Sequence, residues 1–193
     1  MCKVSATETK ERNHMGKEII NEFTNLTNDE LKDEFLKYFS EEQWNQEESL
    51  SKLWPVQLAL CDLLGLEPIP VVVEDIEEDS RFYTKDLYIS ISDKLIGNEV
   101  EALKCLIHEY KHYQQYMCII YNMTEVPFYK KWKEEFEIKD IKDLTYEEII
   151  CQTVEIDATA FAKHILKEWF DIEITHPDPL YNKVLQHYIK NYF

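Results

Sequence analysis

The residues most able to do chemistry form the sequence His108-Glu109-x-x-His112. On a helix, residues four apart stand on the same face, so the two imidazoles can bind one zinc ion from the same side. Glu109 lies about 100° round the helix from His108, beside the metal rather than on it. There the carboxylate can act as general base towards a water bound to the zinc. Zinc would lower the pKa of that water to about 7, so the pattern predicts a hydrolytic zinc site.

The alternative is a metal-free helix with two hydrogen-bonded histidines and an exposed glutamate. The neighbouring residues favour a site. Apolar and aromatic side chains gather opposite His108 on a helical wheel, namely Leu103, Leu106, Tyr110, Tyr113 and Met117. The other face carries the polar residues Glu101, His108, His112 and Gln115. We therefore expect a core helix with an embedded metal site, which opens with a capping box at Asn98 and runs to about Tyr121.

A catalytic zinc site needs a third protein ligand, and Glu155 is favoured for that role. On a helical wheel this residue shares its face with small side chains that would let its helix lie close to the motif helix, namely Ala158, Thr159 and Ala162. Asp157 falls about 200° away, near an apolar edge, which suits a supporting role. Glu148 projects near the same face two turns earlier and stays open as a rival ligand.

The remaining pattern predicts a helix-rich α+β fold with one small antiparallel sheet before the motif helix. Strands are expected at 70–74 and 87–91, with a third short strand at 82–83. Besides the motif helix, helices are expected at 17–23, 27–39, 50–64, 127–137, 145–169 and 180–192. Pro55 fits only the first turn of its helix, and Gly65 should end that helix. We expect a mobile end at 1–15 and a single domain at 16–193, with its core at about 66–170.

Composition excludes some partners. The formal net charge of −17 argues against nucleic acid and anionic membranes. The N-terminal residues lack the apolar stretch of a signal peptide, and no apolar run approaches the ~18 residues needed to span a bilayer. The five cysteines are scattered, without a Cys-x-x-Cys pair, which predicts free thiols and a cytoplasmic location.

Two stretches together resemble a known group of enzymes. Leu106-Ile107-His108-Glu109-x-x-His112-x-x-Gln115, followed by Glu155-x-Asp157-Ala158-x-x-Phe161-Ala162, is similar to small gluzincin-type metallopeptidases. These include minimal zincins of bacteria and phages and the ImmA/IrrE-like proteins. The resemblance covers about residues 85–166. It implies a zincin-like fold with one zinc per chain, bound by His108, His112 and Glu155, with Glu109 as the base.

The chain departs from the group at one position. Thr159 stands where many gluzincins have an acidic or amide residue that braces a ligand histidine. Gln115, one turn beyond His112, is the nearest substitute for that brace. Cys105, one turn before His108, is expected to fill the core rather than to bind metal.

The resemblance also suggests how a substrate would bind. In the group, an edge strand lies antiparallel to the bound peptide, and residues 87–91 are similarly placed before the motif helix. Strand addition there would hold a peptide or protein substrate by its backbone, and ordinary sheet packing is the alternative.

The leading hypothesis is a zinc-dependent metallopeptidase that hydrolyses a peptide bond through the zinc-bound water. One alternative is a catalytically inactive or regulatory zincin-fold protein that binds metal or peptide. The other is a metal-free helical interaction protein.

Overall fold

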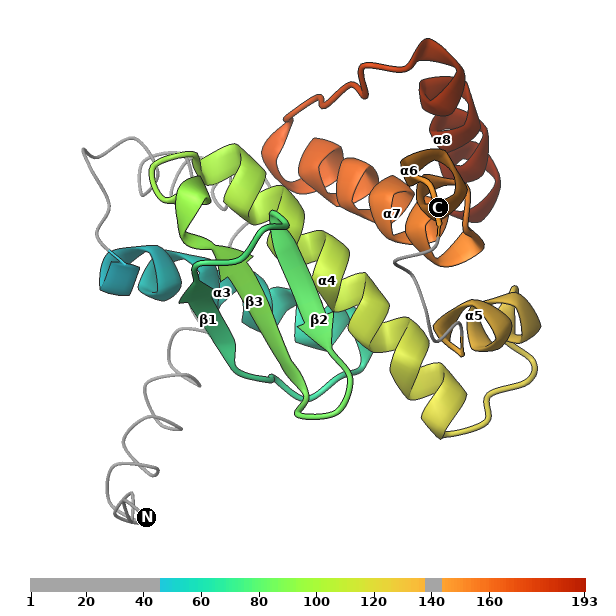
Figure 1. The fold of residues 1–193 in the computed structure, drawn as a ribbon, viewed down its shortest axis with the longest axis horizontal. Coiled ribbons are helices and arrows are strands. Elements are labelled where there is room, and N and C mark those ends of the chain that lie inside the picture. Colours follow the sequence, from blue (N-terminus) through green and yellow to red (C-terminus); the bar gives the residue numbers. More distant parts are fainter. Residues whose placement is uncertain (1–45, 138–143) are drawn as a thin grey trace.

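The computed structural model describes residues 46–137 and 144–193. Their helices and strands follow the order α3 (Gln46–Leu64), β1 (Val71–Glu74), β2 (Ser80–Tyr83), β3 (Tyr88–Ser92), a short 3-10 turn (Asp93–Leu95), α4 (Glu99–Ile120), α5 (Tyr129–Phe136), α6 (Tyr146–Ile150), α7 (Thr153–Phe170) and α8 (Pro179–Tyr192) (Figure 1). The predicted mobile end at 1–15 and the predicted helices at 17–23 and 27–39 lie outside the described residues.

The three strands form one mixed sheet in the order β1–β3–β2. β3 pairs in parallel with β1, where Val71 lies opposite Ile89. It pairs antiparallel with β2, where Ser80 lies opposite Ile91. The α+β class is therefore confirmed, but the prediction of an antiparallel sheet is wrong for β1. The chain reaches β2 at the far edge before turning back into the middle, so the first and last strands run in the same direction.

The position of β3 also overturns the prediction that residues 87–91 bind a peptide by strand addition. This strand has a partner on each side, and its residues from Ile89 to Ser92 are at most 2% exposed. Its backbone groups are already used in the sheet, so a peptide has no edge to join there.

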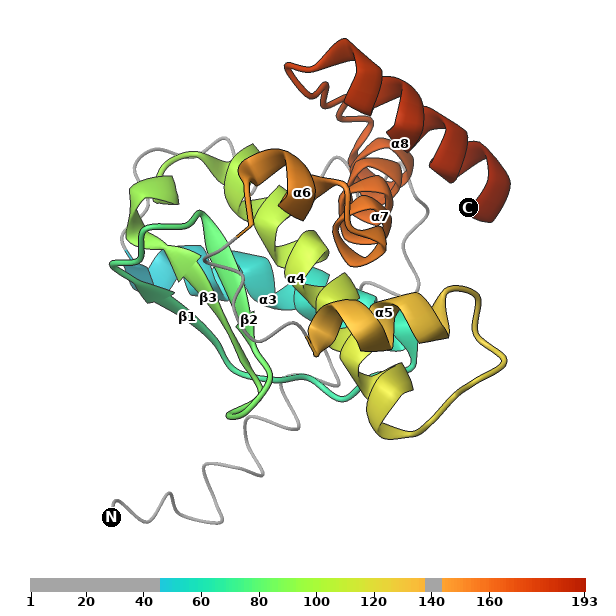
Figure 2. The ribbon, with the colours of Figure 1, turned by 45° about the vertical axis from the view of Figure 1, so that its right-hand side comes forward.

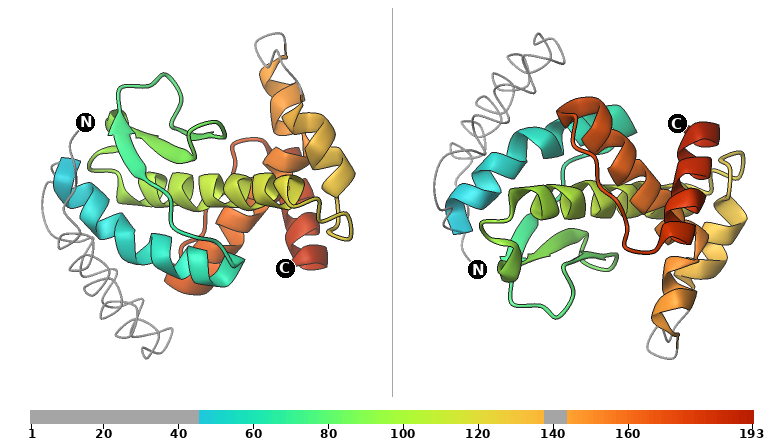
Figure 3. Two further views of the ribbon diagram at one scale, coloured as in Figure 1. Left: turned by 90° about the horizontal axis from the view of Figure 1, so that it is seen from below. Right: turned by 90° about the horizontal axis from the view of Figure 1, so that it is seen from above.

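The main core lies between the sheet and two helices. Ile89 and Ile91 of β3 belong to the same buried cluster as Leu60 of α3 and Leu106 and Tyr110 of α4. Both helices therefore cover the same face of the sheet, and the left view of Figure 3 shows them side by side beneath it. All five residues predicted for the apolar back of α4 contribute to this cluster, which confirms the predicted orientation of the motif helix.

The C-terminal helices pack on the other side of α4 (Figure 2). α7 packs against α4 and is covered in turn by α8, through a second cluster that contains Ala160, Tyr181, Leu185 and Tyr188. α5 adds a third cluster around Trp132, Cys118 and Val154. α4 is thus packed on both sides, by the sheet and α3 on one and by α5 and α7 on the other.

Two of the predicted helices differ from the observed ones by more than two residues. α3 begins at Gln46, so Pro55 lies inside the helix rather than in its first turn. Its missing N–H removes one intrahelical bond, but the buried side chains of Leu53 and Val56 hold the helix against the core. The end of α3 is as predicted: Gly65 has a φ of +66°, and the N–H of Leu66 bonds the Cys61 carbonyl at 2.8 Å, as in a Schellman motif.

The long helix predicted from residue 145 is divided in two. Thr145 forms the expected capping box with Glu148. However, Gln152 has extended backbone angles, which ends α6 and lets α7 begin afresh at Thr153. Within the described residues, every helix is too short or too polar to cross a bilayer.

Candidate metal centre

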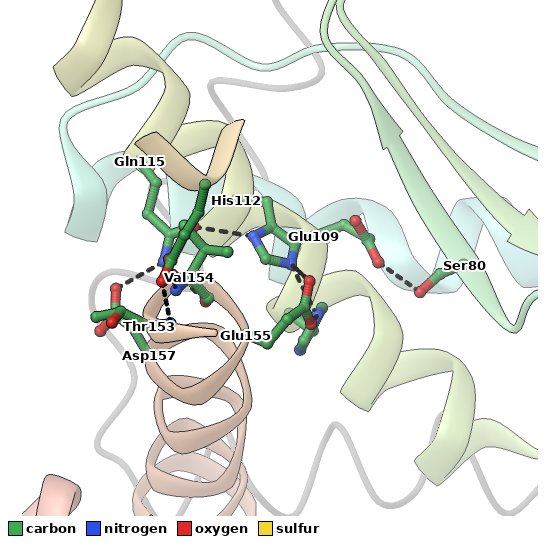
Figure 4. A network of polar contacts seen from close by, with 10 residues as sticks. Ser80, Glu109, His112, Gln115, Thr153, Val154, Glu155 and Asp157 are labelled. Atoms are coloured by element: carbon green, nitrogen blue, oxygen red, sulfur yellow. Dashed lines mark hydrogen bonds and ion pairs between the residues drawn. The ribbon is translucent and has the colours of Figure 1, made fainter. Parts of the chain in front are cut away.

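Three predicted ligands converge at the contact between α4 and α7. His108 and His112 lie on α4, and Glu155 lies in the first turn of α7. Figure 4 shows the side chains of His112 and Glu155 facing each other. The Nε2 atoms of the two histidines lie 2.9 Å apart. The Glu155 carboxylate lies 3.3 Å from each of these nitrogens. Within the described part of the chain, these are the histidine, cysteine and carboxylate side chains grouped closely enough to hold a metal ion, with all ligand atoms within 4.8 Å of one another.

The spacing and chemistry of this group fit a small metal ion. A tetrahedral zinc bound at 2.0–2.1 Å separates its ligand atoms by about 3.3 Å. Both carboxylate–imidazole distances match this value, and the distance between the imidazoles is somewhat shorter. Two imidazoles and one carboxylate form the donor set of catalytic zinc sites, with a fourth position left for water or substrate. The residues therefore fit the ion that the motif implies.

Gln115 fixes the orientation of His112. Its side-chain amide donates to the Val154 carbonyl at 3.1 Å and to the Asp157 carboxylate at 2.8 Å. With the NH₂ group committed to these acceptors, the amide oxygen faces Nδ1 of His112 at 2.9 Å. Nδ1 must then carry a proton, which leaves Nε2 to face the metal position. Gln115 thus provides the brace that Thr159 does not.

The electrostatics of the group suit a bound cation. Burial disfavours the charged form of His112, but the carboxylates of Glu155 and Glu109 outweigh it and raise the pKa of His112 to about 9. Burial alone would raise the pKa of Glu155, yet the two imidazoles hold that pKa far below its ordinary value. At neutral pH the metal-free group is therefore an ion pair, and a bound metal would take the place of the His112 Nε2 proton.

Glu109 is held apart from the three ligands. Its carboxylate is 5% exposed and accepts a hydrogen bond of 2.7 Å from the hydroxyl of Ser80, at the start of β2. Figure 4 shows the Glu109 side chain beside His112, with its carboxylate turned towards Ser80. This arrangement is the one expected of a base that acts beside a metal. Ser80 was not predicted, because no sequence pattern relates it to a residue 29 positions away.

The first turn of α7 is fixed from outside the helix. Gln152, at its N-terminal cap, makes no side-chain capping bond. Instead the carboxylate of Glu135, on α5, accepts the backbone N–H groups of Thr153 and Val154, each at 2.9 Å. A carboxylate at this position satisfies two free donors and complements the helix dipole. Glu135 therefore sets where Glu155 enters the site.

The other candidate residues lie elsewhere. Glu148, the rival ligand, is engaged in the capping box, where it accepts the backbone N–H of Thr145 at 2.8 Å. Cys105 is buried outside the group, and burial raises the pKa of its thiol to about 12. Asp157 is 2% exposed and contacts Gln115 rather than a histidine, as a supporting residue would.

Lys111 is the least expected feature of the site. On the helical wheel it belongs to a polar flank, yet it is 7% exposed. Its ammonium lies 3.4 Å from Asp157 and 2.9 Å from the Gln114 amide oxygen. It also lies 5.1 Å from the centre of the Phe161 ring. Lys111 balances the charge of the Asp157 carboxylate, which accepts the Gln115 amide. Through Gln115, this ion pair also supports the orientation of the His112 ring.

We expect Asp157→Asn to destabilise the protein, because it leaves the Lys111 ammonium buried without its anion. Loss of one partner of a buried ion pair typically costs about 3–5 kcal/mol. The matched control is Asp171→Asn in the exposed pair with Lys167, which should change the free energy of unfolding by less than about 1 kcal/mol. Urea denaturation of the two variants measures the difference. Equal stability of both would show that the Lys111–Asp157 pair contributes nothing.

Comparison with protein-family models, curated proteins and solved structures finds no match to this chain. The assignment of its function therefore depends on the geometry described above and on the motif that places the residues.

Proposed function

We propose that the chain is a zinc-dependent metallopeptidase with a zincin-like fold. The proposal rests on one observation, that the metal ligands and the base are separate side chains that lie close together. His108, His112 and Glu155 converge on one point, while Glu109 is held beside them by Ser80. Two imidazoles and a carboxylate bind the ion, and a separate buried carboxylate is free to move protons.

Bound zinc would lower the pKa of a water and polarise the substrate carbonyl. The side chains of the protein would transfer the protons and orient the groups that react. Glu109 takes the proton of the attacking water and returns it to the leaving amine. Ser80 holds one carboxylate oxygen of Glu109 and so aims the other. Gln115 keeps the His112 ring in the orientation that binds the ion.

The structure suggests a different place for the substrate from the one predicted by sequence. β2 is an edge strand, and among the described strands it pairs only with β3. It begins at Ser80, in contact with the proposed base. An extended peptide added to the outer edge of β2 would pass close to Glu109 and would be recognised through its backbone. We therefore propose a peptide or protein substrate with little dependence on side chains.

The regulatory alternative, a zincin-fold protein that binds metal without turnover, has one observation in its favour. Thr159 stands where many gluzincins have the residue that braces a ligand histidine, and the bond to Nδ1 of His112 comes from Gln115 instead. The four described cysteines are free thiols, which supports the proposal of a reducing compartment such as the cytoplasm for either function.

The proposal is tested with the zinc-loaded full chain and a mixed library of short peptides. We expect cleavage that is abolished by a chelator such as 1,10-phenanthroline and restored by added zinc. Mass spectrometry of the products also gives the cleavage preference. Full zinc occupancy without any cleavage would favour the regulatory alternative, and absence of bound zinc would contradict both.

A further inference from the structure

A cavity of about 360 Å³ lies beside α4, apart from the metal centre. Its walls come mainly from the end of α3, the second half of α4, the segment that leads from α4 into α5, and the C-terminal part of α8. The described residues that line it include neither a metal ligand nor Glu109. Its volume falls within the range of about 300–1,000 Å³ that is usual for small-molecule sites. The lining is mostly apolar, and six of its large side chains are Met117, Tyr121, Phe128, Trp132, Tyr188 and Tyr192.

Apolar side chains are exposed around this cavity. Tyr121, Met123 and Tyr192 all line it, and they are 70%, 38% and 51% exposed. Charged residues make up 31% of the chain, so it does not lack polar side chains for its surface. Exposed apolar side chains that gather around a hollow are typical of binding sites. We therefore expect a ligand with an apolar body.

The wall of the cavity contains a strained residue. Phe128 has a φ of +65°, which is rare for a bulky side chain. Its ring packs against the rings of Tyr188 and Tyr192, with centroids 5.6 and 5.0 Å apart. These contacts hold the ring in the wall, where an apolar ligand would touch it. Strain of this kind is typical of residues that shape a ligand site.

One buried cation, Lys111, lines the cavity. Its ammonium donates to the Gln114 amide oxygen at 2.9 Å and lies 3.4 Å from Oδ2 of Asp157. The second distance is longer than the about 2.7–2.9 Å usual for a charged hydrogen bond. The same oxygen of Asp157 also accepts the Gln115 amide at 2.8 Å. The ammonium thus shares its anion and has a neutral second acceptor, so a carboxylate in the cavity would be a better partner than Gln114.

A second donor in the lining of the cavity is unsatisfied. The indole N–H of Trp132 is buried, and no acceptor for it lies among the described residues. The Lys111 ammonium is 5.9 Å from the centre of the Trp132 ring, so the two donors are neighbours. Buried polar groups normally have partners. The cavity therefore favours a ligand that brings hydrogen-bond acceptors and a negative charge.

From these observations we propose that the cavity binds a small apolar carboxylate, such as a medium-chain fatty acid. Its carboxylate accepts from Lys111 in place of Gln114, and its chain lies against Met117, Phe128 and Tyr188. The net charge of −17 opposes an anion at long range. At physiological salt, however, charges at the surface are screened beyond about 8 Å, whereas the Lys111 ammonium is in direct contact. The site does not require the proposed zinc centre.

The test measures the binding of octanoate to the full chain by calorimetry, with and without added zinc. We expect one octanoate per chain with equal affinity in both cases, because no metal ligand lines the cavity in the described part of the chain. 1-Octanol, which has the same chain without the charge, should bind at least about tenfold more weakly. Lys111→Gln, which can still donate to Asp157 but carries no charge, should cause a similar loss for octanoate.

Met123→Trp tests the cavity without changing the buried ion pair. The larger ring should fill part of the cavity and weaken octanoate binding at least about tenfold. Ile120→Trp is the matched control, since Ile120 is 56% exposed at the end of α4 and does not line the cavity. Its affinity should equal that of the parent. Absence of octanoate binding, equal binding of 1-octanol, equal affinity in Met123→Trp, or binding only with zinc present would each overturn the inference. The proposed function would stand, because it depends on other residues.

Discussion

Glu109→Gln should abolish turnover while leaving the metal and the fold intact. Glutamine has the size of glutamate, and its oxygen can still accept the hydrogen bond from Ser80. It cannot take a proton from water. Loss of a general base typically lowers the rate about a hundredfold to ten-thousandfold. Because the three ligand atoms belong to other residues, zinc content and thermal stability should match those of the parent.

Glu101→Gln is the matched control for this variant. It changes a glutamate two turns before His108 on the same helix, whose carboxylate pairs with Lys104 and is not one of the three ligands. Kinetics on a peptide that the parent cleaves, with zinc content measured on the same samples, decide the outcome. Full activity of Glu109→Gln would mean that another group takes the proton, and the proposed mechanism would be wrong.

Glu155→Ala should cause the second large effect, a loss of zinc affinity. Removal of a direct ligand should cost more than the 10–100-fold typical of a residue that only supports a ligand. Asp157→Ala, which acts on His112 through Gln115, should fall within that smaller range. Glu148→Ala should leave zinc affinity unchanged, because its carboxylate is used in the capping box of α6.

Competition with a zinc-binding dye measures all three affinities. The comparison is sharp because Glu155 and Glu148 were both candidates on sequence grounds, and the structure separates them. A variant of Glu148 that loses zinc more severely than the variant of Glu155 would show that the wrong carboxylate was chosen.

The helical periodicity of the sequence predicted correctly which faces of the helices are buried. The residues on the back of α4 are buried as expected, and α7, which carries the buried Ala158 and Ala162 beside Glu155, packs against α4. Both predictions depend only on the angle between neighbours on one helix. The convergence of Glu155 on His108 follows from two such faces packed together.

Contacts between distant segments could not be predicted in this way. The order of the strands depends on where the chain crosses, so β3 was taken for an edge strand although it lies in the centre. The Ser80–Glu109 bond and the capping of α7 by Glu135 join residues that no local pattern relates. From the sequence alone, Lys111 looks like a surface residue. It is buried because its anion, Asp157, lies on another helix.

X-ray absorption spectroscopy at the zinc edge tests the central claim most directly, because it reports both the presence and the identity of the ligands. With one zinc per chain, we expect only nitrogen and oxygen neighbours at 2.0–2.1 Å, with the outer scattering of two imidazoles. The spectrum of His108→Ala should lose part of that imidazole signal. A sulfur neighbour at about 2.3 Å, as Cys105 would give, or a spectrum without imidazole, would contradict the proposed site.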